Sequence, residues 1–144
     1  MLTENWRFQI DPDQQGEKAG WAEKDFPDQD WPLLQAGRLW ENQGFSYDGM
    51  AWYRRQLDVS ADWRGKKIIM VAEGVDDAYR LWINGKPIAF YGSFTDHSKT
   101  VYQIKTETDL TDFLVIGTMN SIVLQVVDVF GGGGITQPIY LRIE

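Results

Sequence analysis

Apolar and polar side chains alternate through much of the chain, which is the pattern of β-strands that bury one face. Residues 53–59 illustrate it, because Tyr53, Leu57 and Val59 share one face while polar side chains occupy most of the other. Arg55 falls on the apolar face. We therefore expect Arg55 to have a polar partner or to reach solvent.

Seven further segments have the length and composition of short strands. They are residues 6–10, 67–72, 79–83, 87–90, 101–104, 122–126 and 139–143. Asn84-Gly85 lies between two of them and predicts a tight two-residue hairpin turn. Residues 110–114 are expected to form one helical turn, with Thr108 or Asp109 as its cap. About eight strands without a long amphipathic helix predict an all-β fold, a β-sandwich with long loops.

Residues 11–30 have neither helical nor strand periodicity and are rich in Asp, Gln, Gly and Pro. Trp21, Trp31 and Trp40 are spaced through this stretch and the residues after it. We expect a long loop whose aromatic side chains pin it to the sandwich. No repeat or linker divides the chain, so residues 1–144 are expected to form a single domain.

Composition narrows the classes of function. The net charge is -7 and no basic stripe is present, so nucleic-acid binding is not expected. No apolar run approaches about 20 residues, so no membrane-spanning helix is expected. The chain has no cysteine, which excludes disulfides and thiolate chemistry. Its 7 Trp, 6 Tyr and 7 Phe offer flat apolar faces, which suit both a sandwich core and a sugar ring.

Five motifs follow one another along the chain. They are Asp28-Gln29-Asp30-Trp31, Asp48-Gly49-Met50-Ala51-Trp52-Tyr53-Arg54-Arg55, Gly74-Val75-Asp76-Asp77-Ala78-Tyr79 with Leu81-Trp82-Ile83-Asn84-Gly85-Lys86, Gly117-Thr118-Met119-Asn120, and Asp128 with Gly133-Gly134-Ile135. Together they resemble the N-terminal sugar-binding domain of family 2 glycoside hydrolases, the group that contains β-galactosidases and β-glucuronidases.

The resemblance implies a jelly-roll β-sandwich of the galactose-binding-domain-like kind. It also implies a domain that packs beside a catalytic barrel carried later in the chain, and the catalytic glutamates of the family lie on that barrel. We therefore expect no catalytic residue and no required cofactor in this chain. Residues 1–10 lack the regions of a signal peptide, which leaves a cytoplasmic protein or a piece of a longer chain. An extracellular or periplasmic location is expected if the parent enzyme degrades polysaccharides.

A sugar site needs an aromatic platform and a few fixed polar groups. Residues 40–48 have this composition, and their candidate ligand-binding side chains are Trp40, Glu41, Tyr47 and Asp48. The alternative for Trp40 is a loop anchor folded onto the core. Trp52 and Trp82 lie opposite the inward faces of their strands, so we expect them to be exposed or covered by a neighbouring domain.

Asp128 stands just before the four consecutive glycines of residues 131–134. By resemblance it matches the acidic residue that reaches towards the sugar in family 2 enzymes. The alternative is an Asp that begins a turn and accepts hydrogen bonds from the N–H groups of the glycines.

Metal and nucleophilic chemistry have few candidates. His97 is the only histidine, which excludes a histidine-rich zinc site, and a solvent-facing loop position is expected for it. Asp11, Asp13 and Asp28 are candidate ligands for a structural calcium ion. The alternative, a solvated acidic loop, is favoured.

Three functions are therefore compared. The leading hypothesis is a non-catalytic carbohydrate-binding domain that serves a glycoside hydrolase, with carbohydrate and a catalytic domain as its partners. The second is an interaction domain, a spacer or dimerisation surface, whose sugar site is silent. The third is a small stand-alone hydrolase or lyase, which requires two or more buried carboxylates of shifted pKa in one cleft.

Overall fold

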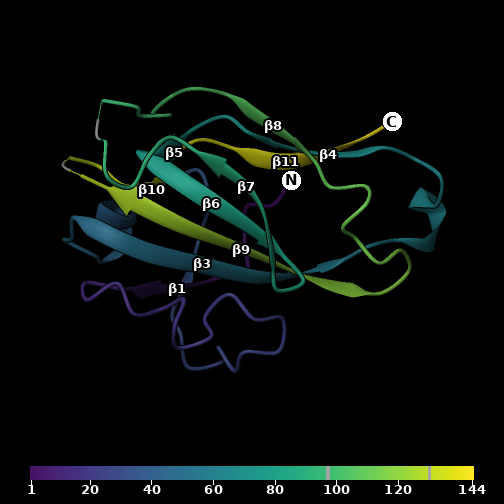
Figure 1. Ribbon diagram of the computed structural model, residues 1–144, viewed down its shortest axis with the longest axis horizontal. Helices are drawn as coiled ribbons and strands as arrows, with labels where there is room; N and C mark the ends of the chain where they lie inside the picture. Colours follow the sequence, from purple (N-terminus) through teal and green to yellow (C-terminus); the bar gives the residue numbers. More distant parts are fainter. Residues whose placement is uncertain (97, 130) are drawn as a thin grey trace.

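The computed structural model describes residues 1–96, 98–129 and 131–144, and it is almost entirely β-structure (Figure 1). The described chain contains eleven strands and two short 3-10 helices. They are β1 (Trp6–Ile10), β2 (Leu33–Leu34), η1 (Trp40–Gln43), β3 (Gly49–Asp58), η2 (Ala61–Trp63), β4 (Ile68–Ala72), β5 (Val75–Asp76), β6 (Ala78–Ile83), β7 (Lys86–Tyr91), β8 (Thr106–Asp109), β9 (Met119–Asp128), β10 (Gly134–Ile135) and β11 (Ile139–Ile143).

The strands form two antiparallel layers. Six of them make the larger sheet, in the order β2-β1-β3-β9-β6-β7. The opposing layer contains the sheet β11-β4-β8. Strands β10 and β5 pair only with each other and form a separate two-stranded sheet. Figure 1 shows β4, β8 and β11 lying along one side of the larger sheet. The predicted all-β jelly-roll sandwich is confirmed, and eight of its described strands are four residues or longer.

The core lies between the two layers and follows the predicted alternation. In the larger sheet Tyr53 faces Leu124 across the β3–β9 ladder, and Leu81 faces Leu124 across the β6–β9 ladder. All three side chains are fully buried. From the opposing sheet Ile68 and Met70 are also fully buried and belong to the same cluster. Strand period therefore decides which side chains meet in the centre.

The outer face of the larger sheet is covered as well. Trp52 and Trp82 are 0% and 7% exposed, and they form a second apolar cluster with Val123, Ala22 and Trp31. The expectation that Trp52 and Trp82 are exposed is wrong. The reason is that the long loop of residues 11–32 folds back over this face, as Figure 1 shows beneath β1 and β3.

Arg54 attaches this loop to β3. Its side chain is 1% exposed, and its Nε donates a 2.8 Å hydrogen bond to a carboxylate oxygen of Asp28. Further hydrogen bonds run from its guanidinium to the carbonyl oxygens of Trp21, Glu23, Lys24 and Phe26. One buried cation therefore satisfies a run of loop carbonyls that the sheet itself cannot reach.

Arg55, predicted to need a partner or an exit to solvent, has partners. Its guanidinium donates to the carbonyl oxygens of Glu4 and Gln56 and lies 5.7 Å from the ring centre of Trp6. Burial lowers the pKa of this guanidinium.

The hairpin prediction is confirmed, because Asn84 and Gly85 both take positive φ angles, 49° and 84°, between β6 and β7. The strand predicted for residues 101–104 is wrong: this segment forms a turn, and the strand is β8, Thr106–Asp109. Residues 106–109 form the strand because they pair antiparallel with β4.

Residues 110–114 form a hydrogen-bonded turn, in which the Leu114 N–H donates to the Leu110 carbonyl oxygen at 3.2 Å. The Asp109 carboxylate accepts from the Thr111 N–H at 2.9 Å, as a cap does. Within the described residues, neither of the helices is long and apolar enough to cross a membrane.

Candidate functional site

Loops from three parts of the chain meet at one end of the sandwich. Asp128 is the last residue of β9 and pairs with Gly49, the first residue of β3. Asp76 ends β5 and pairs with Gly134 of β10. Helix η1 lies at this same end, at the left of Figure 1. Sheet pairing thus gathers acidic side chains that are far apart in the sequence.

Trp40 holds the η1 loop on the sandwich. Its ring is fully buried, and its indole N–H donates a 2.9 Å hydrogen bond to the Tyr47 carbonyl oxygen. It packs 5.5 Å from Phe8, measured between ring centres. A ring enclosed in this way presents no face to a ligand, so Trp40 is the loop anchor and its proposed role as a stacking platform is wrong.

The glycine-rich segment packs directly on this anchor. The Trp40 N–H donates to the Gly133 carbonyl oxygen, and the Gly133 N–H donates to a Glu41 carboxylate oxygen at 2.9 Å. Gly134 has a φ of 102°, and a β-carbon there would lie 2.1 Å from the Tyr53 hydroxyl. Glycine is required at Gly134 because no side chain fits and the backbone angle is left-handed.

Asp128 lies below this segment and is 1% exposed. Among the described residues, neither of its carboxylate oxygens has a hydrogen-bond partner. The alternative that it caps the glycine turn is therefore wrong for the described glycines, because the Gly133 N–H is bonded to Glu41 instead. A buried carboxylate without donors costs free energy, so this position calls for an explanation in terms of function.

Two groups of three acidic residues converge on Asp128. One contains Glu41 and Asp48, and the other contains Asp76 and Asp77. In each group one carboxylate oxygen per residue lies within 4.8 Å of the others. Glu41 and Asp48, predicted from the loop, and Asp128, predicted from the resemblance, are thus brought together. Tyr47 precedes Asp48 in the chain, and its hydroxyl donates to the Met50 carbonyl oxygen at 2.8 Å.

The surroundings of the cluster raise the pKa values of two of its carboxyl groups. Burial raises the pKa of Asp128 to about 8, with a further contribution from the neighbouring carboxyl of Asp48. Burial also raises the pKa of Asp76 to about 9, assisted by the neighbouring Asp77. Both shifts have the same physical origin, since desolvation and like charge each disfavour the ionised form.

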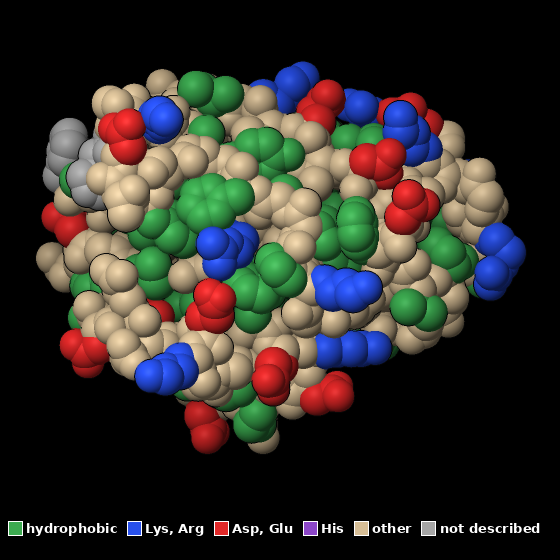
Figure 2. All heavy atoms as spheres, in the orientation of Figure 1, with side chains coloured by type: hydrophobic (Ala, Val, Ile, Leu, Met, Phe, Trp, Pro, Cys, Tyr) green, Lys and Arg blue, Asp and Glu red, His purple; other side chains and the backbone are tan. Residues whose placement is uncertain are grey.

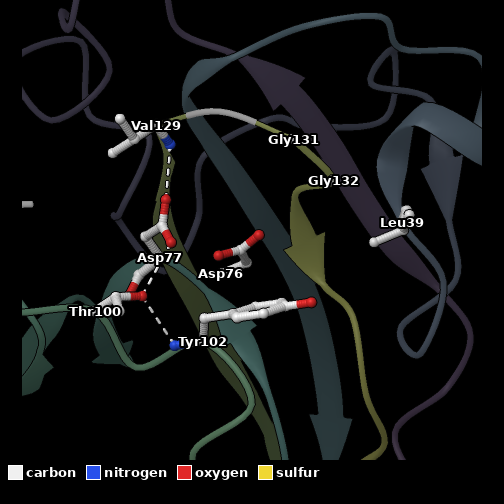
Figure 3. Close-up of a pocket in the computed structure, with 8 residues that line it drawn as sticks. All are labelled: Leu39, Asp76, Asp77, Thr100, Tyr102, Val129, Gly131 and Gly132. Carbon is white, nitrogen blue, oxygen red and sulfur yellow. Dashed lines mark hydrogen bonds between the residues drawn. The ribbon is translucent and has the colours of Figure 1, made fainter.

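Asp77 ties the loops around the cluster together. One of its carboxylate oxygens accepts from the Val129 N–H and the other from the Thr100 hydroxyl, both at 2.9 Å (Figure 3). The Thr100 hydroxyl oxygen in turn accepts from the Tyr102 N–H at 3.0 Å. These bonds fix the segment around residue 100 against the end of β9.

Two clefts flank the acidic cluster. The first has a volume of about 420 Å³ and is lined by Leu39, Asp76, Asp77, Thr100, Tyr102, Val129, Gly131 and Gly132. The second has a volume of about 300 Å³ and is lined by Gln14, Asp48, Gly49, Met50, Phe94, Val127, Asp128 and Val129. Val129 lines both clefts, and carboxylate oxygens of Asp76 and Asp128 lie within 4.8 Å of each other, so the two clefts adjoin at the acidic cluster.

Sequence reasoning missed Asp76, Asp77, Thr100 and Tyr102. Asp76 and Asp77 occur within a motif quoted for the family resemblance, but no local pattern marks them as ligand-facing. The strand expected for residues 101–104 concealed Tyr102, which lies in a turn and is 48% exposed.

The three residues predicted as calcium ligands do not form a site together, because two of them make other contacts and the third is exposed. The Asp11 carboxylate accepts from the N–H groups of Gln15 and Gly16 and from the Trp52 indole, each at 2.9 Å. Asp28 is paired with Arg54, and Asp13 is exposed. Within the described ranges, no acidic group of metal-binding geometry includes any of the three. The expectation for His97 lies outside the described residues.

The face of the molecule shown in Figure 2 carries acidic and basic side chains interspersed with small hydrophobic patches. No broad area of a single charge dominates this face. The gathering of acids at the end of the sandwich is therefore a local feature.

Comparison with known proteins gives one family. The profile described as Glycosyl hydrolases family 2, sugar binding domain, matches residues 41–138. No curated protein sequence matches the chain.

Solved structures show the same fold. A β-glucuronidase from glycoside hydrolase family 2 superposes with a TM-score of 0.80 at 18% identity, covering 99% of this chain and 17% of that one. A family 2 member from Bacteroides cellulosilyticus gives 0.77 at 21% identity, covering 99% and 20%. A β-glucuronidase from Ruminococcus gnavus gives 0.74 at 22% identity, covering 88% and 20%. The chain thus spans about a fifth of the length of these proteins.

Proposed function

The chain belongs to the sugar-binding domain family of glycosyl hydrolases family 2, and from this premise we propose that it binds a sugar ring at the Asp128 end of its sandwich. In this proposal it is a non-catalytic part of a glycoside hydrolase, and its partners are a carbohydrate and the catalytic domain of the parent enzyme.

The proposal depends on one observation, the burial of Asp128 without a hydrogen-bond partner. It is 1% exposed, and neither carboxylate oxygen has a hydrogen-bond partner among the described residues. Sugar hydroxyls are strong donors that a carboxylate accepts at short distance, so a sugar supplies what this position lacks. An unpaired buried acid destabilises the folded domain, so its presence favours a role in binding.

The cleft beside Asp128 has suitable walls for a sugar. Asp48 adds a second carboxylate, and the half-buried ring of Phe94 adds an apolar surface. Glu41 holds the Gly133 N–H and so positions the loop above Asp128. Trp40 and Tyr47 support this loop from below, and their role is positioning.

Stand-alone hydrolysis requires a different arrangement. Asp76 and Asp128 do form a buried pair of raised pKa, which meets the first requirement of that hypothesis. A two-carboxylate glycosidase, however, needs one protonated and one ionised group on either side of the bond. Here both pKa values are raised and the oxygens lie within 4.8 Å of each other. This favours binding over catalysis.

The test is a glycan-array screen of the purified chain, followed by calorimetry with the sugar that binds. We expect Asp128→Ala to weaken binding by about tenfold or more, since a hydrogen bond to a charged group contributes roughly 1.5–3 kcal/mol. Its unfolding free energy should stay within about 1 kcal/mol of the unmodified chain, because no hydrogen bond of a described residue is lost.

The matched control is Asp13→Asn, an exposed acid in the 11–32 loop. It should leave both affinity and stability unchanged. Equal affinity of Asp128→Ala and the unmodified chain would exclude the role given to Asp128. A folded chain that binds no sugar on the array would instead favour the interaction-domain hypothesis.

A further inference from the structure

We propose that the larger cleft, bordered by Asp76 and Tyr102, binds an organic ligand that carries a protonated amine, with the ammonium group between Asp76 and Asp128. The inference rests on the proposed function and extends it to the adjoining cleft, which shares Val129 with the cleft beside Asp128, and it names the class of sugar bound there, an amino sugar.

The cleft combines apolar walls with an acidic floor. Leu39, Tyr102 and Val129 line its sides, and Tyr102 is 48% exposed. Figure 3 shows the Asp76 carboxylate in the middle of the cleft, beside the ring of Tyr102, with Leu39 facing it from the other side. A volume of about 420 Å³ lies within the range of small-molecule sites. Such walls contact the carbon skeleton of an organic ligand while the floor contacts its charge.

The two carboxylates lie close enough together for one ammonium group to contact both. Oxygens of Asp76 and Asp128 lie within 4.8 Å of each other. A tetrahedral nitrogen that donates two hydrogen bonds of about 2.8 Å places its acceptors about 4.6 Å apart. Asp76 is 4% exposed and Asp128 is 1% exposed, so both hydrogen bonds would form out of bulk water, where charge-assisted bonds are strongest.

The charge balance of this end favours a cation. None of the five ion pairs found among the described residues involves Asp76, Asp128, Glu41 or Asp48. Burial first, and then the neighbouring carboxyl groups, raise the pKa values of Asp76 and Asp128, and a bound cation favours the ionised form of both. A uronic acid would add a further carboxylate to this cluster, whereas an ammonium ion neutralises part of it.

An organic cation explains more of the site than a metal ion does. A hard divalent cation takes oxygen ligands and water, so it makes no use of Leu39, Tyr102 and Val129. An amine attached to a ring uses these walls and the carboxylates together. Binding of a metal is accordingly an outcome of the test.

The experiment is a titration of the isotope-labelled chain, followed by NMR, with methyl glucosaminide and methyl glucoside. These ligands differ by one amino group, and a pH of about 6.5 keeps the amine protonated. We expect the glucosaminide to bind at least about tenfold more tightly, with shifts centred on Tyr102, Val129 and Gly132. Asp76→Asn should reduce this preference to about twofold or less, because it removes one of the two carboxylates that hold the ammonium group.

Each other result is decisive. Equal affinity for the two ligands, both lost in Asp128→Asn, would overturn the amine preference and leave the proposed function intact. Failure of both ligands to bind would overturn both. Tight binding of calcium alone that excludes the glucosaminide would also overturn the amine preference. If Asp76→Asn does not fold, Tyr102→Ala replaces it, and an unchanged affinity for the glucosaminide in that variant would contradict the proposal.

Discussion

At the scale of single residues, the buried and half-buried acids discussed above divide into two kinds. Asp11 and Asp28 accept hydrogen bonds from backbone, indole and guanidinium donors, and they hold the fold together. Asp76 and Asp128 lie among other carboxyls, and burial raises the pKa of each. The first kind stabilises the folded state through these hydrogen bonds, and the second kind stabilises it only when protonated or paired with a ligand.

This difference predicts the pH dependence of stability. Asp76 and Asp128 have folded-state pKa values of about 9 and about 8, against an ordinary value of 3.8 for aspartate. Between these limits the folded state binds more protons than the unfolded state, so stability falls as pH rises. We expect the free energy of unfolding to decrease by several kcal/mol between about pH 5.5 and pH 8.5, measured by urea denaturation, because each group costs about 1.4 kcal/mol per pH unit below its folded-state pKa.

Asp128→Asn provides the comparison for this prediction. It removes one of the two titrating groups, so its stability should fall less steeply over the same interval, while other titrating groups contribute equally to both proteins. Parallel curves for the variant and the unmodified chain would show that Asp128 titrates normally and would contradict the prediction.

At the scale of elements, the loop of residues 11–32 acts as a third layer. It covers the outer face of the larger sheet with Trp21, Trp31 and Phe26 and seals Trp52 against solvent. Two polar links attach it, one from Arg54 to Asp28 and one from the Trp52 indole to Asp11. An aperiodic loop keeps one conformation here because its carbonyl groups find donors in a neighbouring strand.

Arg54→Ala should therefore be strongly destabilising. It leaves Asp28 and several loop carbonyls without their donor and opens a space beneath the loop. We expect a loss of about 3–5 kcal/mol, the range seen when one partner of a buried ion pair is removed. Chemical denaturation followed by tryptophan fluorescence measures it.

The control for this substitution is Glu17→Gln. It removes the ion pair with Arg80, whose side chains are 30% and 50% exposed and whose N···O distance is 3.3 Å. An exposed pair of this kind contributes at most about 1 kcal/mol. Similar losses for the two variants would contradict the role assigned to Arg54.

At the scale of the whole molecule, the three layers share strands. β3 carries Tyr53 on its inner face and Trp52 on its outer face, so the main core and the loop cluster rest on the same backbone. The carboxylate cluster depends on that backbone too, because Asp128 pairs with the first residue of β3. Loss of the central strands therefore disrupts both cores and the site together.

This sharing predicts that the 144-residue chain unfolds as one cooperative domain. Far-ultraviolet circular dichroism, which reports the sheets, and tryptophan fluorescence, which reports both clusters, should give the same denaturation midpoint. An earlier fluorescence transition would mean that the loop layer detaches first and would contradict a single cooperative unit.

The sequence alone determined the parts of this protein that depend on local periodicity. Alternation in residues 53–59 and 122–126 defined the inner faces of β3 and β9, and Asn84-Gly85 defined the hairpin, because strand geometry and positive φ are properties of a few adjacent residues. Motifs along the chain identified the family, and they placed Asp128 among the candidate site residues.

Only the tertiary structure decided which distant segments cover each face of the sheets. Trp52 and Trp82 are buried because a loop distant in sequence folds over them, and strand alternation carries no information about that third layer. Trp40 lies in the main core because it packs against Phe8, a residue 32 positions away in the sequence. Asp76 joins Asp128 through the pairing of β5 with β10, a contact between residues about sixty positions apart. The site is the product of long-range pairing, which short-range patterns do not encode.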